Sequence, residues 1–158
     1  MAWHEDKAMR GDLTGGCLCR AVRDTLRDGL RFRPYACHCT DCQTRIGSAF
    51  SEHMLFAKRD LDIEGDLDRG AYKQPSGALS TIWGCAACKV RIFTENDKRP
   101  GLASLRCGTL DRSHEIVPAA HLWVSSKQVW VTVPDGVPAL PNGPHPGIPS
   151  AAFVRSER

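Results

Sequence analysis

Seven of the eight cysteines in this chain of 158 residues fall into three short clusters. The clusters are Cys17-Leu18-Cys19, Cys37-His38-Cys39-Thr40-Asp41-Cys42 and Cys85-Ala86-Ala87-Cys88. The first and third clusters together supply four thiolates, which is the full ligand set of a tetrahedral structural zinc. If they share one ion, the fold must bring the beginning of the chain beside its middle. This pairing limits the possible folds more than any other feature of the sequence.

The middle cluster supplies three thiolates, Cys37, Cys39 and Cys42, and leaves one coordination position open. Three protein ligands with a vacant fourth position are typical of a catalytic zinc. In an extended segment residues i and i+2 project to the same face, so Cys37 and Cys39 can converge on one ion. The intervening His38 is then expected to point away, and we do not expect it to be a ligand.

The eighth cysteine, Cys107, leaves an alternative open. As a fourth thiolate it would close the middle site and remove the case for catalysis. We expect it instead to be a small buried hydrophobic residue, because a lone cysteine in a strand usually is. A redox pair at Cys85 and Cys88 is disfavoured, because no βαβ pattern surrounds it. A disulfide framework is disfavoured too, because such domains are usually smaller and secreted.

Composition and charge exclude several classes of function. The formal net charge is +3 and the basic residues are scattered, so the chain lacks the basic stripe of a nucleic-acid-binding protein. No apolar stretch resembles a signal peptide or reaches the ~18 residues of a membrane span. We therefore expect a cytoplasmic protein whose thiols stay reduced, with no nucleic-acid or membrane partner.

Turn signals recur between short apolar and β-branched runs, which indicates a mostly β, mostly antiparallel domain with short helical turns. The expected strands cover residues 19–26, 30–35, 50–56, 61–64, 70–73, 79–83, 90–94, 103–107 and 122–133. Residues 27–29, Arg-Asp-Gly, predict a hairpin between the first two of these strands. We expect an N-terminal extension over 1–14, one zinc-binding domain over 15–138, and a Pro-rich tail over 139–158.

The motifs resemble those of the glutathione-dependent formaldehyde-activating enzyme family, to which centromere protein V is also related. The resemblance covers roughly residues 15 to 138. It is carried by the three clusters together with Gly15-Gly16, Gly108-Thr109-Leu110-Asp111, Pro118-Ala119-Ala120-His121-Leu122-Trp123, Ser126-Lys127 and Trp130.

The resemblance implies a β-rich, tent-like fold with two zinc ions per chain. It places Cys17, Cys19, Cys85 and Cys88 at the structural zinc, and Cys37, Cys39 and Cys42 at the catalytic zinc. It further implies a carbon-sulfur lyase that joins glutathione and formaldehyde into S-hydroxymethylglutathione, so that the partner is a small-molecule thiol such as glutathione. The rival function, from a different class, is a non-enzymatic zinc-binding module that binds a protein partner.

Three thiolates around one zinc carry a formal charge of −1, and a thiolate substrate would make it −2, so donors or cations should lie nearby. The candidates are Arg45, Arg91 and His53, although solvated positions are the ordinary expectation for all three. We expect His121 to be a hydrogen-bonded structural histidine. Trp83, Trp123 and Trp130 are expected in the core.

The chain departs from the family pattern at a few positions. Arg20 and Lys89 stand where glycine is usual, and residues 43–47 replace a segment that is typically rich in arginine, serine and glycine. The metal ligands are unaffected by these changes. These changes do put the identity of the substrate in question.

Overall fold

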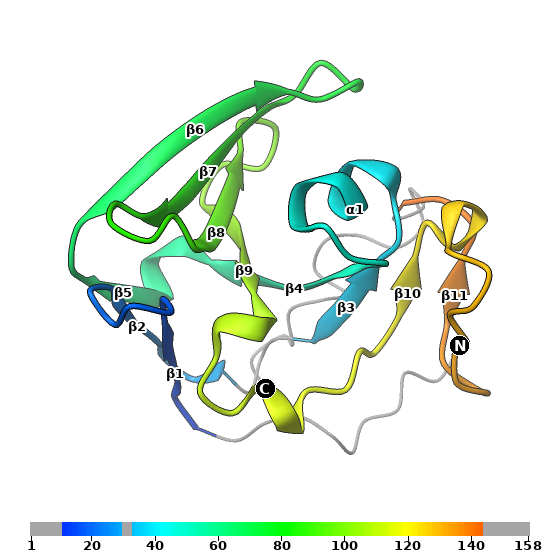
Figure 1. The fold of residues 1–158 in the computed structure, drawn as a ribbon, viewed down its shortest axis with the longest axis horizontal. Helices are drawn as coiled ribbons and strands as arrows, with labels where there is room; N and C mark the ends of the chain where they lie inside the picture. The colour runs from blue at the N-terminus through cyan, green and yellow to red at the C-terminus, as the bar shows by residue number, and fades with distance from the viewer. Residues whose placement is uncertain (1–10, 30–32, 144–158) are drawn as a thin grey trace.

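Strands arranged in two sheets make up most of the structure, a computed structural model that describes residues 11–29 and 33–143 (Figure 1). The mostly β class predicted from the turn pattern is confirmed. The smaller sheet is antiparallel, with the order β1-β2-β5. Its strands are β1 (Leu13–Gly16), β2 (Arg23–Leu26) and β5 (Leu61–Glu64).

The larger sheet has eight strands in the order β11-β10-β3-β4-β9-β8-β7-β6. They are β3 (Pro34–Cys37), β4 (Ser51–Ala57), β6 (Leu67–Lys73), β7 (Leu79–Cys85), β8 (Arg91–Asn96), β9 (Leu102–Arg106), β10 (His121–Leu122) and β11 (Ala139–Leu140). Neighbouring strands are antiparallel except β10, which runs parallel to both β3 and β11. Figure 1 shows the sheet bending, so that its β6–β7 end and its β10–β11 end lie on opposite sides of the helix.

Helical structure is short. One α-helix, α1 (Thr40–Ile46), is present among the described residues, and it begins inside the middle cysteine cluster. The 3-10 turns are η3 (Lys58–Asp60), η4 (Cys107–Thr109), η5 (Ser113–Glu115) and η6 (Val124–Ser126). No helix in this part of the chain is long and apolar enough to cross a membrane.

One predicted hairpin and one predicted strand are wrong. The hairpin at residues 27–29 does not form, because β2 pairs with β1 and β5, and Arg27 donates its backbone N–H to Asp60. The strand over 122–133 ends at Leu122. There Trp123 takes a left-handed conformation at φ 60° and is followed by η6, so extended pairing cannot continue.

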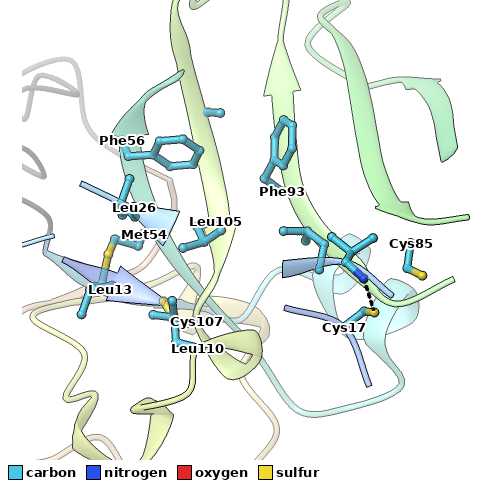
Figure 2. Packing of buried hydrophobic residues seen from close by; sticks show 13 residues of the cluster. Leu13, Cys17, Leu26, Met54, Phe56, Cys85, Phe93, Leu105, Cys107 and Leu110 are labelled. Atoms are coloured by element: carbon cyan, nitrogen blue, oxygen red, sulfur yellow. Dashed lines mark hydrogen bonds between the residues drawn. The ribbon is translucent and has the colours of Figure 1, made fainter. Parts of the chain in front are cut away.

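The main core lies between the two sheets. Leu13 and Leu26 from the smaller sheet face Met54 and Phe56 of β4 and Leu105 of β9, as Figure 2 shows. A second cluster on the opposite side of β4 contains Leu55, Ala120 and Leu122. Strand β4 is therefore buried on both faces and forms the centre of the fold.

The tryptophans do not all join this core. Trp83 packs against it, with its ring stacked on Phe93 at a centroid distance of 6.0 Å. Trp123 is 39% exposed and Trp130 is 70% exposed, so the expectation of burial is wrong for these two. Both lie after the end of β10 and outside any strand. The alternation of side chains along a strand therefore does not direct them toward the core.

One buried charge stands out in the smaller sheet. Asp24 on β2 is 2% exposed, and neither of its carboxylate oxygens has a hydrogen-bond partner. Burial raises the pKa of Asp24 to about 6, although the neighbouring Arg23 acts in the opposite direction. The ionised form is therefore less favourable in the folded protein than in the unfolded chain.

We predict that Asp24→Asn stabilises the protein at pH 7 by about 2 kcal/mol, because it removes this buried charge. The folded pKa of Asp24 lies above the unfolded one. Wild-type stability should therefore fall as the pH rises from about 4 to about 6, and the advantage of Asp24→Asn should vanish near pH 4. Urea unfolding across this pH range measures both effects. An equal difference at pH 4 and pH 7 would contradict the explanation.

Candidate metal centres

The first and third cysteine clusters meet in space at the ends of strands from different sheets. Cys17 directly follows β1, and Cys85 is the last residue of β7. The four sulfur atoms of Cys17, Cys19, Cys85 and Cys88 lie within 4.8 Å of one another. We call these residues the four-cysteine cluster. It joins the smaller sheet to the larger one.

The spacing of the sulfur atoms suits a tetrahedral metal. Cys17 Sγ lies 3.5 Å from Cys19 Sγ, which lies 3.7 Å from Cys85 Sγ. Four sulfurs at about 2.3 Å from a zinc ion are separated by about 3.8 Å. The residues present therefore fit a zinc ion in both chemistry and spacing.

Backbone N–H groups donate to sulfurs of this cluster. Although burial raises the pKa of Cys17, the backbone N–H of Val22 helps to lower it below its ordinary value. Val22 donates its backbone N–H to Cys17 Sγ at 3.2 Å, the dashed line in Figure 2, and Cys88 donates to Cys85 Sγ at 3.4 Å. The backbone N–H groups of Cys19 and Val90 lower the pKa of Cys88 to about 6. Part of this cluster is thus suited to release its proton near neutral pH.

The residue after each turn of the four-cysteine cluster has a left-handed backbone conformation. This explains why glycine suits these two positions. Arg20 and Lys89 have φ values of 67° and 62°, in the left-handed region that glycine adopts without strain. Lys89 also pairs with Asp68 at 2.7 Å. The departures from glycine therefore keep the turn geometry and place two basic side chains beside the cluster.

The middle cluster is built where β3 runs into α1. Cys37 ends β3, Cys39 caps the helix by accepting the backbone N–H of Cys42 at 3.3 Å, and Cys42 lies in the first helical turn. Their sulfur atoms also lie within 4.8 Å of one another. We call them the three-cysteine cluster. Hydrogen bonds from the Cys37 and Cys42 thiols lower the pKa of Cys39.

His38 points away from this cluster, as the strand geometry predicted. Its Nε2 lies 2.8 Å from Nδ1 of His121, and the two rings stack. His121 is therefore the hydrogen-bonded structural histidine expected from the sequence. Gln43 donates to the carbonyl oxygens of His38 and Ser126, which holds the segment after β10 against the three-cysteine cluster.

Cys107 does not join the three-cysteine cluster. It is fully buried beside Met54 and Leu110 in the main core, where Figure 2 shows it apart from the sulfurs of Cys17 and Cys85. Burial raises the pKa of its thiol. The expected role as a small buried hydrophobic residue is confirmed, and no fourth thiolate from the described residues reaches the three-cysteine cluster.

The groups beside the three-cysteine cluster include a cation that the sequence did not reveal. His53 Nε2 lies 3.6 Å from Cys42 Sγ and 3.3 Å from Nη1 of Arg106. Arg106 stands opposite His53 in the β4–β9 register and also donates to Ser51 Oγ. Only strand pairing brings these residues together, and the sequence carried no signal of it.

The expectations of solvated positions for His53 and Arg45 are wrong. His53 is buried, and desolvation followed by the charge of Arg106 lowers its pKa to about 3, so its imidazole is neutral near pH 7. The Arg45 guanidinium lies 3.4 Å above the ring centre of Tyr72 and pairs with Asp41 at 3.7 Å. Arg91 is half-buried, and its Nη1 atom has no hydrogen-bond partner.

A cavity of about 480 Å³ opens beside the three-cysteine cluster. Cys39 is the member of the cluster that lines it. The opposite walls come from the turn between β6 and β7, including Gln74, and from Trp123 and Ser126 after β10. A small molecule in this cavity can therefore contact Cys39.

The fold and the two clusters define a mostly β protein with two sulfur-rich sites that could each bind a metal ion. Residues 12–126 match the family described as glutathione-dependent formaldehyde-activating enzyme, and the chain belongs to that family. No curated protein matches significantly. Among solved structures, the crystal structure of a Rhodobacter sphaeroides protein is similar, with 18% identity, a TM-score of 0.46, and coverage of 66% of this chain and 97% of that one.

We predict that Cys107→Ser lowers the unfolding free energy by about 1–3 kcal/mol without changing the number of metal ions bound. The loss arises because a hydroxyl without a partner is buried in the core. Native mass spectrometry gives the metal content, and urea unfolding gives the stability. Loss of one metal ion from an otherwise folded Cys107→Ser protein would show that Cys107 is a ligand.

Proposed function

We propose that the protein is a zinc-dependent carbon-sulfur lyase that acts on a thiol adduct, with glutathione and formaldehyde as its substrates. The observation that carries this proposal is the three-cysteine cluster, which offers three thiolates and faces a cavity through Cys39. Membership of the family supports a function related to glutathione and formaldehyde. Three ligands beside an accessible cavity are typical of a catalytic metal site.

The two clusters would hold zinc in different roles. Soft thiolate ligands favour zinc over hard cations such as magnesium or calcium. Cys17, Cys19, Cys85 and Cys88 would form a closed structural site, because four sulfurs complete a tetrahedron. Cys37, Cys39 and Cys42 would form the catalytic site. When bound there, zinc supplies a Lewis acid that can favour the thiolate form of a substrate or polarise an aldehyde carbonyl.

The reaction itself is an addition. The glutathione sulfur forms a bond to the formaldehyde carbon, the carbonyl π bond breaks, and the proton of the thiol ends on the resulting hydroxyl oxygen. The protein binds and orients the two molecules. Trp123 and Gln74 line the cavity in which they would meet beside Cys39.

The surrounding side chains offset the negative charge of this site. Three thiolates with a zinc ion carry one net negative charge, and a bound thiolate substrate adds a second. Neutral His53 can donate its Nε2–H to the Cys42 thiolate, while Arg106 keeps its hydrogen bond to Ser51. The Arg106 guanidinium lies 3.3 Å from Nε2 of His53, so it supplies a positive charge close to the Cys42 thiolate.

A zinc-binding module without activity, acting through a protein partner, is the second candidate. It is favoured by Val129 and Trp130, which are 98% and 70% exposed on the segment that follows η6. Exposed large apolar side chains next to each other are a feature of interaction surfaces. Measurement of turnover separates the two candidates.

We predict that the zinc-loaded protein accelerates adduct formation between glutathione and ¹³C-formaldehyde above the spontaneous rate, measured by exchange NMR. Cys39→Ser should return the rate to the spontaneous value, because Cys39 is the cluster member that lines the cavity. Cys107→Ala is the matched control, since it removes a thiol outside both clusters. A fully zinc-loaded wild type without any acceleration would favour the module.

The two clusters should differ in their effect on stability. We predict that Cys85→Ser lowers the unfolding free energy by on the order of 4 kcal/mol or more, because a structural zinc contributes directly to folding. Cys39→Ser should cost much less and keep the native circular dichroism spectrum. Equal losses of stability in the two variants would contradict the division into a structural and a catalytic ion.

A further inference from the structure

One wall of the cavity at Cys39 stands apart from the other two. The three walls are the start of α1, the 3-10 turn η6, and the turn between β6 and β7. Among the described strands, β6 is the last of the larger sheet and pairs with β7 alone. Strand β8 pairs with β7 only as far as Ser80, so residues 74–78 project beyond the sheet. We call these residues the β6–β7 tip.

The wall from η6 is fixed to α1 by hydrogen bonds. The Gln43 side chain on α1 donates to the carbonyl oxygens of His38 and Ser126, at 2.7 and 2.9 Å. The Ser126 hydroxyl donates to the same His38 carbonyl at 2.9 Å, and Gln128 donates to the Gln43 side chain at 3.3 Å. These two walls are therefore held as one unit.

The β6–β7 tip is braced only from within. Gln74 donates its backbone N–H to the Ala78 carbonyl at 2.8 Å, and Gly77 donates to the Gln74 carbonyl at 2.8 Å. The Gln74 side chain donates to Ser80 Oγ at 2.6 Å. Within residues 11–29 and 33–143, every hydrogen bond of the tip stays inside its own hairpin. The tip is thus a stiff turn without a hydrogen bond to the other two walls.

A cation–π contact ties this hairpin to α1. The Arg45 guanidinium lies 3.4 Å from the ring centre of Tyr72, the last but one residue of β6. Cations within about 6 Å of an aromatic ring centre are attracted to it, and more strongly where water is excluded. The Arg45 side chain is only 19% exposed, and Tyr72 is half-buried. Figure 1 shows the end of the hairpin lying on the same side of the sheet as α1.

The contact at Tyr72 sets where the tip lies. Asp41 is one helical turn before Arg45, about 6 Å along the helix, and it lines the cavity at Cys39. Gln74 is two residues beyond Tyr72, about 7 Å along the chain, and it lines the same cavity. With Tyr72 seated on Arg45, the tip therefore reaches the level of Asp41. A contact at one end of α1 thus fixes a wall of the cavity at the other end.

We propose that Arg45 is a positioning residue that holds the β6–β7 tip closed over Cys39 through its contact with Tyr72. Without that contact, the hairpin at the edge of the sheet can swing away from α1. The role of this closure in the reaction rests on the proposed function. A closed tip keeps the carbonyl compound and the thiol together beside Cys39, as closing loops do in other enzymes.

Alkylation of the zinc-loaded, full-length protein by iodoacetamide tests the closure without requiring turnover. Mass spectrometry gives the initial rate at each cysteine, and the exposed Cys19 serves as the internal reference. We expect Arg45→Met to raise the rate at Cys39, relative to Cys19, by about fivefold or more. Tyr72→Leu should give the same rise, although it keeps the ion pair between Arg45 and Asp41. The double variant should show no further rise, because both changes break one contact.

Two variants serve as controls on the same strand. Arg69→Met removes a guanidinium that lies 5.9 Å from the ring centre of Trp83, away from the cavity, and should alkylate like the wild type. Tyr72→Phe keeps the aromatic ring under Arg45 and should also keep the wild-type rate. Circular dichroism of each variant shows that it is folded.

Three results would overturn the closure by Arg45: wild-type rates at Cys39 in both Arg45→Met and Tyr72→Leu, additive effects in the double variant, or an equal rise in Arg69→Met. Failure of the proposed function is a separate result. It would appear as absent turnover of glutathione and formaldehyde by the zinc-loaded wild type, while the dependence of Cys39 alkylation on Arg45 persisted.

Discussion

The convergence of the first and third cysteine clusters is the constraint on which the rest of the structure depends. Cys17 follows the first strand of the smaller sheet, and Cys85 ends a strand of the larger sheet. Their meeting joins the two sheets around the core, in which Leu13 and Leu26 of the smaller sheet share one cluster with Met54 and Phe56 of the larger sheet. A metal ion at this point would act as a cross-link between segments more than sixty residues apart, where closing the loop costs the most chain entropy.

The three-cysteine cluster depends on this frame through β4. Strand β4 is buried on both faces and pairs with β3, which delivers Cys37, and with β9, which delivers Arg106. The short helix α1 then places Cys39 and Cys42 against the same strand. Three cysteine sulfurs, a neutral histidine and a buried guanidinium are thereby assembled from elements that are distant in sequence.

Local patterns predicted much of the fold. Strands bounded by glycine or proline, such as β5 (Leu61–Glu64) and β7 (Leu79–Cys85), were found close to their observed limits, because turn residues act locally. The predicted strand over 122–133 failed because the left-handed conformation of Trp123 is set by its surroundings, not by its own preference. Helix α1 was missed because seven residues give too little periodicity to recognise.

The sequence by itself determined the grouping of the cysteines, since ligand number and spacing follow from residue identity and the reach of a short turn. It also determined that His38 turns away from its neighbours, because alternate residues of an extended segment face opposite sides. Tertiary structure alone decided that His53 and Arg106 stand beside Cys42. Those positions depend on strand register, which is settled by the packing of whole sheets and by no short stretch of the chain.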